Sequence, residues 1–205
     1  MRTWYTADLH LGHVAISAYT NRPYVAVGAM NEAIVAEFAD HVRPEDTLVV
    51  LGDVAMGQIA ETLPLVGKLP GRKLLVPGNH DRCWVGHGEK AHTWRERYLE
   101  AGFDDILDAP DSIELAGVMV QRSHFPYQGG GDHTEVERYS DHRPLDDGGW
   151  LLCGHVHTQW RQNGRMINVG VDAWGGRPVS LEELEDLVRK GPTEHPVIPW
   201  TDRTG

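Results

Sequence analysis

Short polar motifs recur in a fixed order along the chain, and each of them directly follows a short apolar run. The five motifs are Asp8-Leu9-His10, Gly52-Asp53, Gly78-Asn79-His80-Asp81, Ser123-His124 and Gly154-His155-Val156-His157. Short apolar runs that end at glycine or polar residues are typical of buried strands, so we expect the motifs at strand ends. Hard oxygen and imidazole groups concentrated at strand ends indicate a metal site, because they are common ligands of divalent metals.

The apolar pattern predicts strands that alternate with helices. Residues 47–51 are apolar without alternation, which is typical of a strand buried on both faces. A four-residue spacing predicts one face of a helix, formed by Met30, Ile34, Phe38 and Val42. Further strands are expected at residues 4–7, 74–76, 113–122 (a hairpin), 150–153 and 166–169, and further helices at 59–66, at 94–101 and after a capping box at 180–183. This order predicts a layered α/β sandwich.

The length of 205 residues allows one domain with a sizeable core. We place this domain at residues 1–190 and expect a loose C-terminal tail at residues 191–205, where proline, threonine and glycine are present. Residues 82–92 and 126–149 show no periodicity and are expected to form long loops. Long loops in a compact domain are usually functional or disordered.

The net charge of −11 argues against a surface that binds duplex nucleic acid, because phosphate contacts need a basic face. It does not argue against a small phosphate ester, since bound dications would supply positive charge locally. Two cysteines are too few for a disulfide framework, and we expect free thiols in a reducing compartment. The sequence shows no signal peptide and no membrane-spanning run, which predicts a cytoplasmic protein without membrane contact; its oligomeric state stays open.

Each motif has an ordinary structural explanation when it is taken alone. Asp-x-His and Gly-Asp sequences are common in turns and caps, and Gly-Asn-His-Asp could form a tight turn with Asn79 in the left-handed conformation. Strand side chains alternate between faces, so Asp8 and His10 are expected on the same side, as are the two histidines of the last motif. All five motifs in order, each after an apolar run, favour a metal site over separate turns.

Together the motifs resemble those of the calcineurin-like metallophosphoesterase superfamily, over about residues 3–180. The stretch Asn21-Arg22-Pro23-Tyr24 resembles an element of small bacterial and phage members. The resemblance implies a layered α/β/β/α sandwich of two mixed sheets flanked by helices. It also implies two metal sites that share a bridging carboxylate. The first site comprises Asp8, His10, Asp53 and His157, and the second comprises Asp53, Asn79, His124 and His155.

The resemblance also implies a catalytic role beside the metal. His80 does not bind metal in the family pattern; it lies beside the scissile ester, where it can protonate the leaving oxygen or stabilise the phosphoryl group. Asp81 could orient the ring of His80, as carboxylates commonly do for histidine. Mixed nitrogen and oxygen ligands without a thiolate fit two divalent ions of Mn, Fe or Zn better than Ca, and we favour Mn²⁺.

The activity that the resemblance implies is hydrolysis of a phosphate ester by a hydroxide that bridges the two ions. The short chain without a basic channel favours a small phosphodiester, such as a 2′,3′-cyclic nucleotide. We expect substrate contacts from His13 and Arg22. The other arginines considered for this role are Arg82 and Arg122. A phosphomonoesterase or protein phosphatase is the alternative, and a nuclease or a non-catalytic scaffold of the same fold is less favoured.

Overall fold

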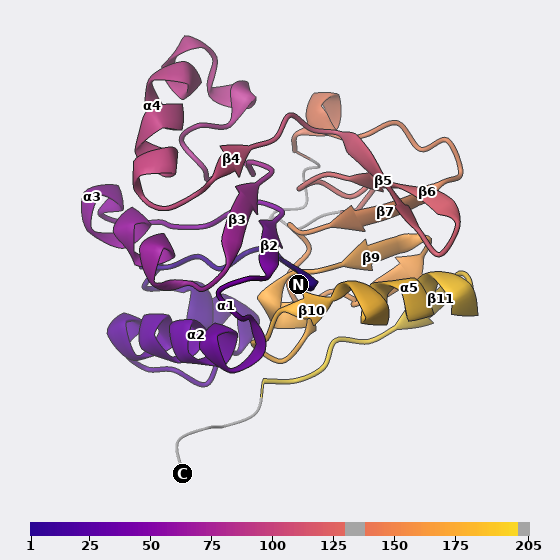
Figure 1. The fold of residues 1–205 in the computed structure, drawn as a ribbon, viewed down its shortest axis with the longest axis horizontal. Coiled ribbons are helices and arrows are strands. Elements are labelled where there is room, and N and C mark those ends of the chain that lie inside the picture. The colour runs from indigo at the N-terminus through magenta and orange to yellow at the C-terminus, as the bar shows by residue number, and fades with distance from the viewer. Residues whose placement is uncertain (130–137, 201–205) are drawn as a thin grey trace.

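Two mixed β-sheets form the centre of the molecule, and helices pack against them (Figure 1). The structure is a computed structural model that describes residues 1–129 and 138–200. The strand order is β10-β1-β2-β3-β4 in the first sheet and β11-β8-β9-β7-β6-β5 in the second. This architecture confirms the prediction of an α/β fold with two mixed sheets and flanking helices.

Parallel pairing dominates the first sheet. Its strands are β1 (Thr3–Thr6), β2 (Thr47–Val50), β3 (Arg72–Leu75), β4 (Asp105–Ile106) and β10 (Val179–Ser180). Strands β1 to β4 run parallel, and β10 runs antiparallel beside β1. The register places Tyr5 opposite Val49, and Val49 opposite Leu74. The residues that follow β1, β2 and β3 therefore meet at the carboxyl edge of this sheet, where open α/β sheets usually bind ligands.

Three parallel strands form the middle of the second sheet, with antiparallel strands on both sides. Its strands are β5 (Asp111–Leu115), β6 (Val118–Arg122), β7 (Trp150–Cys153), β8 (Gln162–Gly164), β9 (Met166–Asn168) and β11 (Thr193–His195). Strands β6, β7 and β9 are parallel to one another. A parallel bridge between Ala7 and Gly170 joins the ends of the two sheets, so the loops after β1, β7 and β9 come together.

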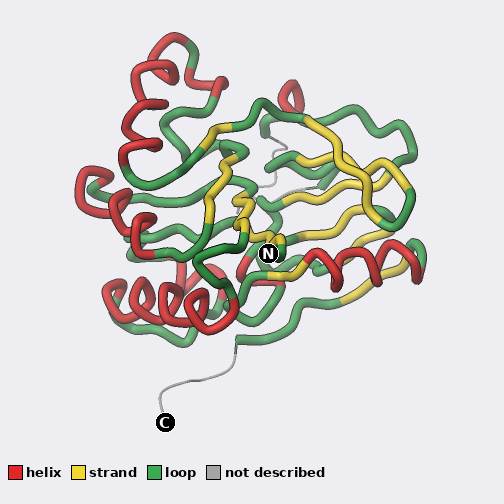
Figure 2. Tube along the Cα trace, viewed as in Figure 1, coloured by secondary structure: helices red, strands yellow, loops and turns green. Residues whose placement is uncertain are grey.

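Most helices lie on the side of the first sheet, and α5 lies beside the second (Figures 1 and 2). The helices are α1 (Ile16–Thr20), α2 (Val27–His41), α3 (Ile59–Thr62), α4 (Glu89–Glu100) and α5 (Leu181–Lys190), with short 3₁₀ helices η1 (Leu63–Lys68), η2 (Val85–His87), η3 (Ser140–His142) and η4 (Val171–Ala173). The helix expected at 59–66 changes to 3₁₀ geometry after Thr62, where Pro64 supplies no N–H for an α-helical bond.

Strand β2 shows how the apolar pattern produces the layers. Leu48 and Val50 pack with Phe38 of α2 in the core on the helix side of the first sheet. Val49 and Leu51 belong to a second core, which lies between the sheets and includes residues of α5. The two sets alternate along one strand because strand side chains point to opposite faces. The prediction that this strand is buried on both faces is therefore confirmed.

Several elements were not visible in the apolar pattern. Helix α4 begins at Glu89, within the predicted loop 82–92. The apolar pattern did not reveal this start, because the first turns of the helix are polar and bury only Ala91. The polar strand β11 pairs with β8, and the ring of Trp200 packs against Tyr24, so residues 193–200 contact the domain although we expected a loose tail there. Residues 130–137 of the other predicted loop, and residues 201–205, lie outside the described residues. Each helix of residues 1–129 and 138–200 is too short or too polar to cross a lipid bilayer.

The capping box at the start of α5 generates a stability prediction. The Ser180 hydroxyl accepts a 3.2 Å hydrogen bond from the Glu183 backbone N–H, and the Glu183 carboxylate accepts one of 3.0 Å from the Ser180 N–H. Ser180→Ala should lower the free energy of unfolding by about 1 kcal/mol, measured by urea denaturation. Ser140→Ala is the control, because η3 has no side-chain cap bond, and an equal loss in both variants would contradict the capping role.

Candidate metal centre

The five polar motifs lie at the ends of β1, β2, β3, β6 and β7, where the carboxyl edges of both sheets meet. Five residues of these motifs have left-handed backbone conformations, with φ between 45° and 71°. These residues are Asp8, His10, Asp53, His155 and His157. The left-handed conformation costs roughly 1–2 kcal/mol for a residue with a Cβ, so surrounding contacts must hold each of them in place.

The left-handed backbone also changes which side chains lie together. Asp8 and His10 do meet, but they follow the end of β1 at Thr6, so strand alternation is not the reason. His155 and His157 belong to different clusters. The φ of Asn79 is not positive, so the alternative in which residues 78–81 form a simple turn with Asn79 in the left-handed conformation is not seen.

Glycines next to the motifs let the loops approach each other closely. A Cβ added to Gly52 would lie 2.5 Å from the backbone nitrogen of Gly78. A Cβ on Gly78 would lie 2.4 Å from Asp53 Oδ1, and one on Gly154 would lie 2.8 Å from Asp8 Oδ2. Real Cβ contacts are never this short, so these positions require glycine for the loops to meet.

The first cluster contains Asp8, His10 and His157, whose candidate ligand atoms lie within 4.8 Å of one another. Both Asp8 carboxylate oxygens accept the backbone N–H of His155, at 3.1 and 2.9 Å. The rings of His10 and His157 have their centroids 5.1 Å apart. Asp8 is thus held by the loop after β7, and the cluster spans both sheets.

The second cluster contains Asp53, His124 and His155, again with ligand atoms within 4.8 Å of one another. His124 Nε2 also lies 3.1 Å from the amide oxygen of Asn79. The other ring nitrogen of His124 lies 2.8 Å from the carbonyl oxygen of Leu51, which can only accept, so Nδ1 carries the proton. His124 Nε2 therefore presents a lone pair toward two oxygen atoms that also accept, Asn79 Oδ1 and Asp53 Oδ2.

Asp53 lies between the two clusters. Its Oδ2 atom is 3.6 Å from His10 Nε2 in the first cluster and 3.5 Å from His124 Nε2 in the second. Its Oδ1 atom accepts the backbone N–H of His80 at 2.9 Å, which fixes the orientation of the carboxylate. One oxygen therefore faces both clusters, which suits a ligand shared by two cations.

The ionisation of the site also suits a cation. Burial lowers the pKa of His10 well below its usual value and lowers the pKa of His155 to about 2. The Nε2 atoms of both rings are buried without a hydrogen-bond partner. Burial opposes the charge on Asp53, but the nearby histidines and the His80 N–H outweigh it and lower the pKa of this carboxyl. Neutral imidazoles and an ionised carboxylate are the forms that bind metal, and the second cluster favours them through His155 and Asp53. In the first cluster burial raises the pKa of Asp8. Burial also opposes the charge on His157, but Asp8 and Asp172 outweigh it and raise the pKa of this histidine, so a cation bound there would displace protons.

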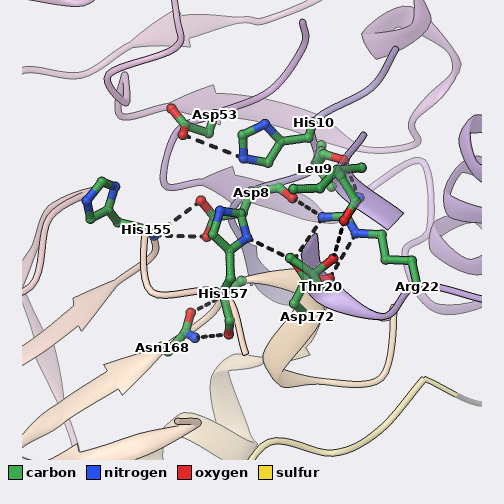
Figure 3. A network of polar contacts seen from close by, with 12 residues as sticks. Asp8, Leu9, His10, Thr20, Arg22, Asp53, His155, His157, Asn168 and Asp172 are labelled. Atoms are coloured by element: carbon green, nitrogen blue, oxygen red, sulfur yellow. Dashed lines mark hydrogen bonds and ion pairs between the residues drawn. The ribbon is translucent and has the colours of Figure 1, made fainter. Parts of the chain in front are cut away.

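Asp172 supports the first cluster from behind, and sequence reasoning missed it. It is completely buried within η4 and accepts His157 Nδ1 at 2.9 Å, as Figure 3 shows. The carboxylate also accepts two N–H groups of Arg22 and the indole N–H of Trp200. Such a partner fixes the ring of a metal-binding histidine and leaves Nε2 free for the ion. Asp172 follows strand β9 closely, as the polar motifs follow other strands, and this position could have identified it from the sequence.

Arg22 belongs to the buried group around Asp172 that holds the His157 ring, and it does not face a substrate site. Its side chain is fully buried, and its N–H groups donate to Asp172 and to the carbonyl oxygens of Asp8 and Leu9. A further donor lies 3.5 Å from the Met30 sulfur. The substrate contact expected of Arg22 is thus wrong, because its donors are already occupied.

Asp81 also has a different role from the expected one. Its carboxylate accepts the backbone N–H groups of Asp53, Val54 and Gly78 at 2.8–3.1 Å, so it ties the loop after β2 to the loop after β3. Burial, with the charge of Asp53 adding to it, raises the pKa of Asp81 to about 6. No contact joins this carboxylate to the His80 ring among the described residues, and the expected orienting role is not seen.

His80 and His13 lie at the rim of the clusters. The side chain of His80 is 40% exposed, and its Nε2 atom lies 3.9 Å from Asp53 Oδ2. The ring centroid of His13 lies 5.4 Å from that of His10, on the side of the first cluster. Arg122 lies elsewhere and pairs with Asp111 on the neighbouring strand. His80 is thus accessible to a substrate and also close to Asp53.

The same arrangement of motifs is found in a known family. Residues 1–187 match the family model described as calcineurin-like phosphoesterase. The chain belongs to the calcineurin-like phosphoesterase family. This family typically binds divalent metals, so the membership identifies the chain as a metal-dependent phosphoester hydrolase and agrees with the two clusters of candidate ligands.

Relatives of this calcineurin-like phosphoesterase occur in phages, archaea and bacteria. The Gene 66 protein of Mycobacterium phage L5 is 35% identical over 200 residues, which cover 91% of this chain and 93% of that protein. An uncharacterised protein of Methanocaldococcus jannaschii is 26% identical, with 90% of each chain covered. Among solved structures, a protein of unknown function from Aquifex aeolicus is 28% identical, with a TM-score of 0.66 over 91% of this chain and 98% of that chain.

The support behind His157 can be tested through metal affinity. Asp172→Asn removes the charge that holds the His157 ring and leaves Arg22 buried without its carboxylate partner. We expect metal affinity to fall about 10- to 100-fold in chelator competition, the usual effect of losing such a partner. Asp186→Asn is the control, because that side chain is 63% exposed on α5. Equal affinities in the Asp172 variant and the unaltered protein would contradict this role.

Proposed function

We propose that this chain is a binuclear metal-dependent phosphodiesterase that hydrolyses small phosphodiesters, with 2′,3′-cyclic nucleotides as candidates. The observation that carries the proposal is the position of Asp53 Oδ2, which lies 3.6 and 3.5 Å from ring nitrogens of two separate clusters. In this proposal Asp53 is a ligand of both ions. The other ligands are Asp8, His10 and His157 for one ion and Asn79, His124 and His155 for the other.

The donor set favours a transition metal. Imidazole and oxygen ligands without a thiolate suit Mn²⁺, with Fe or Zn as further possibilities, better than Ca²⁺. When bound, a pair of such ions would supply positive charge for the phosphoryl oxygens and an activated water as the nucleophile. The protein contributes the fixed, buried ligand positions, which do not need to reorganise when negative charge develops.

In this proposal His80 transfers a proton to the leaving oxygen. Its backbone N–H is bonded to Asp53 Oδ1, which fixes its position relative to the proposed bridging ligand. Its ring is partly exposed at the rim, where an incoming substrate can reach it. The Nε2 atom of the ring lies 3.9 Å from Asp53 Oδ2, so the group proposed as the acid is close to the proposed bridging ligand.

The preference for diesters rests on charge. A dianionic monoester gains more from arginines beside the ions than a monoanionic diester does. Arg22 contacts the carbonyl oxygen of Asp8 but is fully buried and bonded to Asp172, so it cannot neutralise the extra charge of a monoester directly. His13, on the side of the first cluster, is proposed as a substrate contact.

Metal removal and a matched substrate pair test this function. A chelator should abolish hydrolysis and Mn²⁺ should restore it, with two ions bound per chain by elemental analysis. We expect kcat/KM for bis(4-nitrophenyl) phosphate to exceed that for 4-nitrophenyl phosphate. A higher kcat/KM for the monoester would contradict the assignment as a phosphodiesterase and indicate a phosphomonoesterase. Full activity of the metal-free protein would refute the metal mechanism.

The role of His80 can be tested with leaving groups of different basicity. A nitrophenolate leaves readily as an anion, whereas a ribose alkoxide needs a proton. His80→Ala should therefore lower kcat/KM about 10²–10⁴-fold for a nucleotide ester, the usual effect of losing a positioned acid, and much less for the nitrophenyl ester. Metal content should stay unchanged, and His92→Ala on exposed α4 is the matched control. Equal losses for both esters would instead indicate stabilisation of phosphoryl charge.

A further inference from the structure

A cleft of about 570 Å³ opens directly beside the candidate metal centre. Asn79 and His80 line it, and the amide oxygen of Asn79 lies 3.1 Å from His124 Nε2, so the cleft borders the second cluster. Met56 and Trp94 supply apolar wall, and Arg82, His87 and Lys90 supply basic groups. The volume is within the range of small-molecule sites, about 300–1,000 Å³, and exceeds what one phosphate group needs.

The charge of the cleft is opposite to that of the whole protein. The chain has a net charge of −11, yet the residues that line the cleft include no aspartate or glutamate. Arg82 and Lys90 are exposed, and neither forms an ion pair within residues 1–129 and 138–200. A local group of unpaired cations in an acidic protein is a site for an anion, because it concentrates positive potential where the rest of the surface repels anions.

The guanidinium of Arg82 has a defined position in this cleft. Its central carbon lies 5.2 Å from the centroid of the Trp94 ring, and the Arg82 backbone N–H donates to the Tyr98 hydroxyl. Lys90 lies in the first turn of α4, which also carries Trp94. An arginine held against an aromatic ring loses less freedom when it binds an anion, and its planar group suits phosphate.

We propose that this cleft binds a second phosphate group, carried by the leaving alcohol of the diester. The inference rests on the proposed function, because His80 marks the leaving side only if it protonates the leaving oxygen. His80 and the two cations, Arg82 and Lys90, line the same cleft. The substrate class is a diester in which the departing group is itself a phosphorylated alcohol, such as a nucleotide, and the apolar wall takes its uncharged part.

Matched dinucleotides test the proposal with the metal-loaded protein. The probes are adenylyl-3′,5′-adenosine (ApA) and its forms with a terminal 5′- or 3′-phosphate (pApA and ApAp). The two phosphorylated forms cover both possible leaving sides. We expect one of them to have a kcat/KM about tenfold above that of ApA at low salt, which corresponds to about 1.4 kcal/mol. This advantage should shrink as ionic strength rises, since the cations are exposed.

Variants of the cleft separate recognition of the second phosphate from catalysis. In Arg82→Gln/Lys90→Gln, the ratio of kcat/KM for the preferred phosphorylated form to that for ApA should fall to near one. Arg97→Gln is the control, because Arg97 lies over the same Trp94 ring at 4.6 Å but does not line the cleft, and its ratio should stay at the unaltered value. Melting temperatures of all variants verify that they fold.

The outcomes distinguish this inference from the proposed function. Metal-dependent hydrolysis of all three dinucleotides at equal kcat/KM would overturn the second-phosphate site and leave the phosphodiesterase intact. Equal losses for ApA and its phosphorylated forms in the double variant would also overturn it, and would assign the cations to the scissile phosphate. Hydrolysis of none of the three, with activity on a phosphomonoester, would overturn both. A tenfold preference that the double variant removes would support the site.

Discussion

Ring nitrogens of two clusters face one carboxylate oxygen of Asp53 at distances longer than an ordinary hydrogen bond, and the rest of the site is arranged around this constraint. Asp53 Oδ2 lies 3.5 and 3.6 Å from ring nitrogens of His124 and His10. In a buried site with low effective dielectric, such acceptor groups destabilise the fold unless positive charge lies between them. A cation in each cluster would remove this cost. The fold gives Asp81 and Asp172 several hydrogen bonds each, whereas the Nε2 atoms of His10 and His155 are buried without a hydrogen-bond partner.

Two buried carboxylates outside the clusters maintain the arrangement. Asp81 joins the backbone of the loops after β2 and β3, and Asp172 joins Arg22, His157 and Trp200. Both act through several hydrogen bonds to fixed groups, which is how a protein holds left-handed, strained segments in one conformation. Trp200 thus contributes to the environment of a candidate metal ligand, although it lies beyond the last helix.

Positive charge in this acidic protein is local. The candidate metal clusters and the Arg82–Lys90 cleft lie next to each other, because Asn79 lines the cleft and its amide oxygen lies 3.1 Å from His124 Nε2. The net charge of −11 opposes the binding of extended polyanions, while in the proposed site the cations confined to one cleft would select a small anionic ester. Specificity among phosphate esters would then depend on how the charges of the substrate are spaced and not on its total charge.

The sequence alone determined the alternation of strands and helices and the position of the polar motifs at strand ends, because both depend on local patterns. The apolar run 47–51, the α2 face, the capping box at Ser180 and the motifs at strand ends could be recognised from neighbouring residues. The polar starts of α4 and β11 could not, since tertiary contacts and not apolar periodicity stabilise them. The roles of Arg22 and Asp81 were decided only in the folded chain. Arg22 binds a carboxylate 150 residues away, and no local pattern specifies whether a buried charge will meet a substrate or a distant partner of opposite charge.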